Sequence, residues 1–175
     1  MKKISLLLLF FAITFNVIAQ DKEEEVYPQD VGKKTEIKLN ALTLLAGKWI
    51  DLSYERLIDE ESSYGISGAL NTDTSKNSLH YSLTPFYRRY FSEKFARGFF
   101  IEGFGMLFSA EDRGAFSNNS HKTETGFAFG VSVGGKWVSK KGFTTELLLG
   151  VGRNMVNSNY NDTVGRAAIS VGYRF

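Results

Sequence analysis

Residues 126–137 read GFAFGVSVGGKW, and this stretch decides the fold class because bulky apolar residues occupy every second position. One face carries Phe and Val residues and ends in Trp137, whereas the other carries Gly, Ala and Ser and ends in Lys136. A repeat of two residues is typical of a β-strand, whose successive side chains point to opposite faces. The stretch therefore predicts a strand with one apolar face.

The same alternation recurs along the chain between clusters of Gly, Asn, Ser, Asp and Lys, which are typical of turns. Eight strands are predicted, at residues 35–45, 48–57, 63–71, 79–90, 98–108, 126–137, 142–153 and 166–175. Strands of about ten residues can cross a bilayer at a tilt, and connections that alternate between shorter and longer are typical of membrane barrels. We expect an all-β fold, an eight-stranded antiparallel up-and-down transmembrane β-barrel over residues 34–175.

The strand faces opposite the apolar ones collect charge. By parity they hold five acidic and five basic residues, which are Glu36, Asp51, Glu55, Glu102, Glu146, Lys38, Arg88, Lys136, Arg166 and Arg174. Each unpaired charge facing hydrocarbon would cost several kcal/mol, so these side chains are expected to face a lumen and to pair there. An eight-stranded barrel is just wide enough for its own side chains. We therefore predict an ion-paired plug, with a charge-lined pore as the alternative.

Aromatic residues gather on the apolar faces near one end of the strands. They are Tyr54, Tyr64, Tyr87, Trp137, Phe143 and Tyr173. Such rings are typical of the girdle that membrane proteins place at the lipid headgroups. Arg89 and Arg153 share the apolar-face parity at strand ends, where Arg153 would either reach water or meet lipopolysaccharide phosphates.

The N-terminal residues predict export. Lys2 and Lys3 precede an apolar run, and Val17 and Ala19 stand at the positions that a signal peptidase reads, so residues 1–19 are predicted to be a signal peptide. Residues 20–33 are then a polar N-terminal lead-in. No later run of 18 apolar residues predicts a membrane helix, and the predicted location is the outer membrane.

The last strand supports this location by resemblance. Its apolar residues at every second position, ending in Phe175, resemble the C-terminal signature strand of outer-membrane proteins. The resemblance implies that Ile169, Val171, Tyr173 and Phe175 carry the signal that the barrel-assembly machinery reads. Over residues 34–175 the chain is similar to small OmpA/OmpX-type barrels. Residues 53–56 (SYER) and 84–90 (TPFYRRY) resemble motifs of uncharacterised outer-membrane barrels of the domain-of-unknown-function type. Such families share a fold without a single activity.

The composition excludes several classes of protein. The chain of 175 residues has no Cys, which excludes a disulfide scaffold, a zinc finger and thiol chemistry. Removal of residues 1–19 would leave 19 basic and 19 acidic residues, so nucleic acid is not an expected partner. Since no His and carboxylate cluster has metal-ligand spacing, neither a metal nor another cofactor is expected.

One motif resembles an enzyme site. His80-Tyr81-Ser82 resembles the His-x-Ser pair of lipid A deacylases, with Glu93 as the nearest acid, but the following residues differ and the pair should face the lumen. We therefore expect no enzyme. The alternatives are a lipid A-modifying enzyme, a narrow channel and a soluble periplasmic lipocalin-like ligand binder. The predicted role is structural or surface interaction through outer loops at residues 109–125 and 154–163, with membrane lipid and lipopolysaccharide around the barrel.

Overall fold

The computed structural model describes residues 32–47, 49–72, 79–92, 94–111, 123–156 and 163–175. The predicted signal peptide and nearly all of the predicted lead-in lie outside these residues. Glu93 and the larger parts of the two predicted outer loops lie outside them as well. The predictions made for those segments therefore stay predictions.

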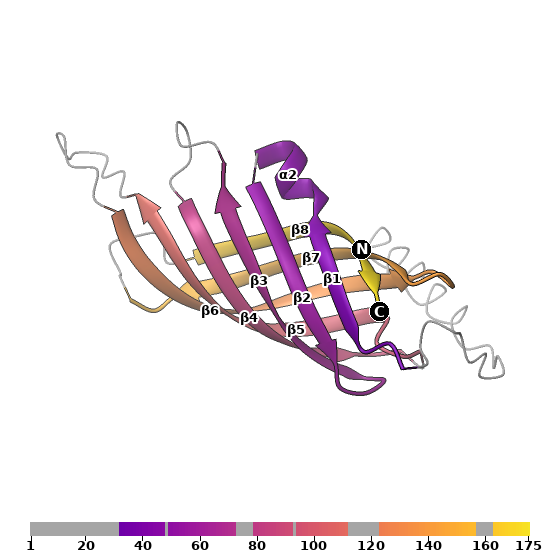
Figure 1. Cartoon of the computed structure of the whole chain (residues 1–175). Coiled ribbons are helices and arrows are strands. Elements are labelled where there is room, and N and C mark those ends of the chain that lie inside the picture. The colour runs from indigo at the N-terminus through magenta and orange to yellow at the C-terminus, as the bar shows by residue number, and fades with distance from the viewer. Residues whose placement is uncertain (1–31, 48, 73–78, 93, 112–122, 157–162) are drawn as a thin grey trace, which may run out of the picture.

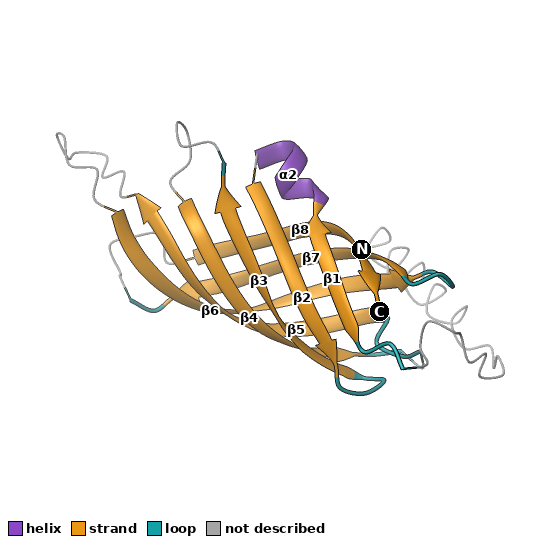
Figure 2. Cartoon of the chain, in the orientation of Figure 1, coloured by secondary structure: helices purple, strands orange, loops and turns teal. Residues whose placement is uncertain are grey.

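The described chain forms a closed barrel of eight antiparallel strands in sequence order, as predicted (Figure 1). The strands are β1 (Thr35–Asn40), β2 (Trp49–Leu57), β3 (Ser62–Asn71), β4 (Leu79–Tyr90), β5 (Gly98–Glu111), β6 (Thr123–Val138), β7 (Phe143–Asn154) and β8 (Thr163–Arg174). The sheet closes where β8 pairs with β1, with Ile37 opposite Tyr173. Apart from the short helix α2 (Ala41–Gly47), the elements in Figure 2 are strands. No helix in the described ranges is long and apolar enough to cross a membrane.

Helix α2 corrects the prediction for the first strand. A strand was predicted to run to residue 45, but β1 ends at Asn40 and α2 follows directly. The segment ALTLLAG consists mainly of Ala and Leu, which are strong helix formers. Asn40 caps its start, since the side-chain Oδ1 accepts a hydrogen bond from the backbone N–H of Thr43 at 3.4 Å. Local helix propensity and this cap outweigh the apolar character that predicted a strand.

The strands turn their apolar residues outward and their charges inward. On β7, Leu149 is 67% exposed on the outer wall, whereas its neighbour Leu148 points inward and is 3% exposed. Glu55 and Glu102 point into the barrel and are completely buried. This is the reverse of the usual arrangement in water, where charged side chains are almost never fully buried unless they are paired.

Apolar side chains also occupy the interior of the barrel, in two clusters. One buried cluster contains Phe86, Phe104, Met106, Phe108 and Ala128, and the other contains Leu57, Tyr90, Ala96, Phe100 and Leu148. Glycines on the inner wall make room for these rings. A Cβ added at Gly130 would collide with the ring of Phe104 and with the backbone of β7. The rings thus seat directly against a backbone that carries no side chain.

Candidate functional site

Glu55 on β2 is the centre of a charge network inside the barrel. Its carboxylate accepts hydrogen bonds from Lys38 at 2.5 Å, Ser63 at 2.6 Å, Tyr90 at 2.6 Å, Lys136 at 2.7 Å and Arg88 at 2.9 Å. These donors stand on β1, β3, β4 and β6. A single carboxylate therefore ties together strands from several sides of the barrel.

Arg88 on β4 is the second hub. Its Nε donates to Glu102 at 2.6 Å, and its Nη1 and Nη2 donate to the two carboxylate oxygens of Glu146 at 2.7 and 2.9 Å. The guanidinium also lies 4.4 Å from the ring centre of Phe86 and 4.5 Å from that of Phe100. A planar, delocalised cation can stack on rings while its edge donates several bonds, which an ammonium group cannot do. The position therefore specifically requires arginine.

Arg174 joins the network to the end of the barrel where the C-terminus lies. Its Nε donates to Glu36 at 2.7 Å, and Glu36 also accepts a bond from Lys136 at 2.8 Å. The same guanidinium donates to the carbonyl oxygens of Phe95 and Ala96, at 3.2 and 2.9 Å, in the turn between β4 and β5. Ala96 is completely buried. The turn is thereby held in the mouth of the barrel and closes this end.

The turn between β2 and β3 at the same end carries an exposed carboxylate. Hydrogen bonds from the side chain of Ser62 and from the backbone N–H of Glu61 lower the pKa of Asp59 below its ordinary value. The Glu61 bond is 2.9 Å long. Because Asp59 is exposed, its ionisation affects the turn and not the lumen.

Toward the other end, Glu102 pairs with a second arginine. Its Oε1 accepts a bond from Arg166 at 2.5 Å and one from Ser132 at 3.1 Å, and Arg166 lies 4.7 Å from the ring centre of Phe104.

Asp51 differs from the other predicted lumen acids, since its carboxylate accepts a bond from the Asn40 amide at 3.0 Å. Nine of the ten predicted lumen charges thus meet in ion pairs with one another.

The network leaves little space between its members. A cavity of about 20 Å³ lies among Asn40, Asp51, Arg88, Glu146 and Arg166, together with serines of the inner wall. That volume holds about one water molecule. Together with the complete burial of Glu36, Glu55 and Glu102, this small volume indicates closely packed side chains around the ion pairs.

Asn40 is a structural residue that the sequence reasoning missed. Its side chain caps α2, and its amide also donates to the carbonyl oxygen of Ala167 at 3.3 Å. Its Oδ1 accepts from the N–H of Ile169 at 3.2 Å, so the side chain continues the pairing with β8 past the end of β1. An Asn directly before a run of Ala and Leu was the signal that could have revealed the cap. Tyr90 and Ser63 were missed as well, although both share the inward parity of the charges.

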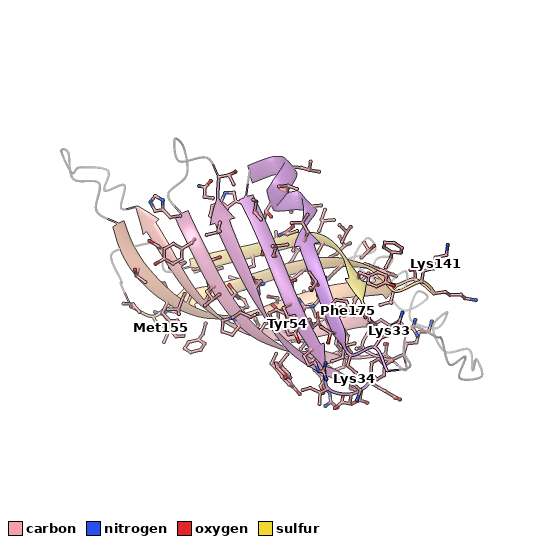
Figure 3. The ribbon with its side chains drawn as sticks, viewed as in Figure 1. Lys33, Lys34, Tyr54, Lys141, Met155 and Phe175 are labelled. Atoms are coloured by element: carbon pink, nitrogen blue, oxygen red, sulfur yellow. The ribbon has the colours of Figure 1, made fainter. Side chains whose placement is uncertain are left out.

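The outer wall carries the predicted aromatic and assembly residues. Tyr54, Tyr64, Tyr87, Trp137, Phe143, Tyr173, Ile169, Val171 and Phe175 are all exposed there. The rings of Phe143 and Tyr173 pack edge to face, with centres 5.5 Å apart. Figure 3 shows Lys33, Lys34 and Lys141 at the end where Phe175 lies, and Met155 toward the opposite end. One rim thus combines lysines with exposed rings.

The residues considered for chemistry belong to β4 and the segment that follows it. Ser82 is buried on the inner wall of β4, and His80 is half-buried beside a register shift at the start of that strand. Glu93 lies outside the described residues. Within the described ranges, no group of three His, Cys, Asp or Glu side chains could hold a metal ion.

The comparison with protein families gives one match. A family model described as "Protein of unknown function (DUF3575)" matches residues 5–172. No curated protein and no solved structure matches the chain. The matched residues include strands β1 to β7 completely and most of β8.

Proposed function

The chain belongs to this family of unknown function, and we propose from its geometry that it is an outer-membrane β-barrel with a charge-plugged lumen. In this proposal the barrel has no catalytic activity. It is an anchor or structural element of the cell envelope, and its loops opposite the termini contact a partner or the surroundings. Residues 1–19 would serve as its export signal.

One observation carries this proposal, namely that the barrel is apolar outside and charged inside. On β7 the outward residues Leu147, Leu149 and Val151 are exposed, whereas the inward residues Glu146 and Leu148 are buried. A soluble monomer rarely exposes a contiguous apolar patch larger than a few hundred Å². Lipid chains would cover such a surface, and the closed barrel leaves no strand edge to be satisfied in the bilayer.

The filled lumen favours an anchor over the other functions considered. A ligand-binding barrel would need an interior site of about 300–1,000 Å³, whereas the cavity among the ion pairs measures about 20 Å³. A channel would need a continuous polar path, but the buried acids and bases bind one another directly. The ion pairs are therefore best explained as the structural filling of the barrel.

The rim at the C-terminus suggests how the barrel would be oriented. Exposed aromatic rings and the lysines of Figure 3 lie together there, as expected of a surface at the lipid headgroups. The connections at this end are short, with β6 and β7 joined by residues 139–142. Short turns face the periplasm in bacterial barrels, so the connections from β5 to β6 and from β7 to β8 would face outward.

Fluorescent labelling along β7 tests the membrane proposal, because the chain has no native Cys. Single-Cys variants Leu147→Cys, Leu148→Cys and Leu149→Cys would carry an environment-sensitive dye in vesicles containing brominated lipid. We expect strong quenching at positions 147 and 149 and weak quenching at the inward position 148. A gel with boiled and unboiled samples would show for each variant that the barrel is folded. Equal quenching at all three positions, or a protein that stays soluble, would contradict the proposal.

Two measurements separate the anchor from its alternatives. Planar-bilayer recordings should show no discrete conductance steps, and steps that change in the Glu102→Gln variant would indicate a channel. Unchanged lipid A in cells that overproduce the protein is expected for a non-catalytic barrel, whereas loss of an acyl chain would indicate an enzyme.

A loop replacement tests the proposed contact with a partner. Replacement of residues 112–122 by a short Gly-Ser linker should abolish partner binding and preserve the heat-dependent gel shift.

A further inference from the structure

Three arginines stand on the outward faces of the strands and differ in their partners. Arg56 donates to the hydroxyl of Thr35 at 2.9 Å, and Arg89 pairs with Glu61. Arg153, the second-last residue of β7, is exposed, and its side chain has neither a hydrogen bond nor an ion pair among the described residues. It therefore presents a guanidinium group on an apolar wall without an anion from the described protein.

Arg153 lies at one end of an open groove in this wall. The groove has a volume of about 500 Å³ and is lined by Phe129, Gly130, Val131, Val151, Gly152, Arg153 and Thr163. Phe129, Val131 and Val151 are each more than half exposed. Arg153 is paired in register with Phe129 on β6 and with Thr163 on β8. The groove thus combines an apolar floor with a cation and a hydroxyl group at its loop end.

We propose that this groove binds an anionic membrane lipid from the leaflet at the loop end of the barrel. One acyl chain lies against Val131 and Val151, and the lipid phosphate accepts hydrogen bonds from the Arg153 guanidinium. The Thr163 hydroxyl lies next to Arg153 and can donate a further bond. This inference rests on the proposed membrane-spanning function.

The chemistry of the groove selects this ligand. An unpaired arginine near hydrocarbon is unfavourable, and a phosphate compensates it well because the guanidinium fork matches two phosphate oxygens. A volume of about 500 Å³ lies within the range of small-molecule sites. An inorganic phosphate would use only Arg153 and Thr163, whereas a lipid also covers the apolar floor.

Native mass spectrometry of the full-length protein in a non-ionic detergent tests the site, with phosphatidylglycerol as the probe. We expect one tightly retained lipid on the wild type and about tenfold weaker retention on the Arg153→Gln variant. Arg89→Gln is the matched control, because Arg89 is also an outward arginine but has Glu61 as its partner. Its lipid binding should equal that of the wild type, and Arg153→Lys should retain part of the binding.

The outcomes separate this inference from the membrane proposal. Equal phosphatidylglycerol retention by the wild type and Arg153→Gln would overturn the lipid site, even if the β7 labels report lipid contact. Competition by inorganic phosphate at the same concentration as the lipid would also overturn it, since the apolar floor would then contribute nothing. If the β7 labels report no lipid contact and the protein stays soluble, the membrane proposal fails and this inference fails with it.

Discussion

Neutralising Glu55 is the most direct test of a dry, ion-paired lumen. Glu55→Gln keeps the size of the side chain and removes its charge. The carboxylate now accepts five hydrogen bonds, three of them from the cations Lys38, Arg88 and Lys136. An amide oxygen can accept some of these bonds but cannot balance the charges. The substitution therefore leaves one excess positive charge in the barrel.

The contacts that remain set the size of the effect. Removing one partner from a buried ion pair typically costs about 3–5 kcal/mol. Lys38 would retain Glu146 at 2.6 Å, and Lys136 would retain Glu36 at 2.8 Å. Because these anions compensate in part, we expect the lower end of the range, a decrease of about 3 kcal/mol in the free energy of unfolding. Stabilities of folded domains are about 5–15 kcal/mol, so the loss is readily measured.

Urea unfolding in lipid vesicles, followed by the fluorescence of Trp49 and Trp137, measures this loss. The midpoint should fall without a change in the slope of the transition. Glu61→Gln is the control, since Glu61 and Arg89 form an exposed pair with more than half of each side chain accessible. It should cost less than about 1 kcal/mol. If Glu55→Gln costs no more than Glu61→Gln, water screens the lumen charges and the plug interpretation is refuted.

Four further predictions follow from individual contacts. Arg88→Lys should lower the unfolding free energy by about 2 kcal/mol, because an ammonium group loses the two-ring stacking and the paired bonds to Glu146; an unchanged urea midpoint would contradict it. Asn40→Ala should cost about 1–2 kcal/mol by removing the cap of α2, and should reduce amide-exchange protection at Ile169. Gly130→Ala should abolish the heat-dependent gel shift, whereas Gly103→Ala should preserve it, because a Cβ at 103 meets nothing within 4 Å. The pKa of Asp59 is lowered in the folded protein, so its ionised side chain stabilises the fold above its ordinary value of 3.8. The stability difference between the wild type and Asp59→Asn should therefore vanish as the pH falls below the lowered pKa, and a difference that persists in acid would exclude this cause.

The inward and outward faces of the strands could be predicted because they depend only on local geometry. In β5, apolar residues occupy both faces, yet Glu102 alone indicated which face is inward, and Glu102 is completely buried. In a pleated strand every second side chain points to the same side, so one charged residue is enough to tell which side chains of its strand point inward and which point outward. The ten lumen residues could be selected by the same rule.

Helix α2 shows where such local reasoning did not extend. Residues 41–45 are mostly apolar and were assigned to the first strand, although Asn40 and the Ala and Leu residues favour a helix. Period alone cannot separate a short buried strand from a short helix. Asn40 ends the strand and begins the helix through contacts with β8. One of them is its hydrogen bond to Ala167, which is 127 residues away in the sequence.

By itself, the sequence determined the barrel class and the face on which each charge lies, because the two-residue repeat of a strand is a property of the backbone. Only the tertiary structure decided which charges bind one another. Lys38 could have paired with any inward acid, and closure of β8 onto β1 places it between Glu55 and Glu146. The stacking of Arg88 between two rings depends on the register of β4 against β5, because Phe86 stands on β4 and Phe100 on β5. Parity acts within one strand, whereas pairing across a lumen depends on the register of all eight strands together.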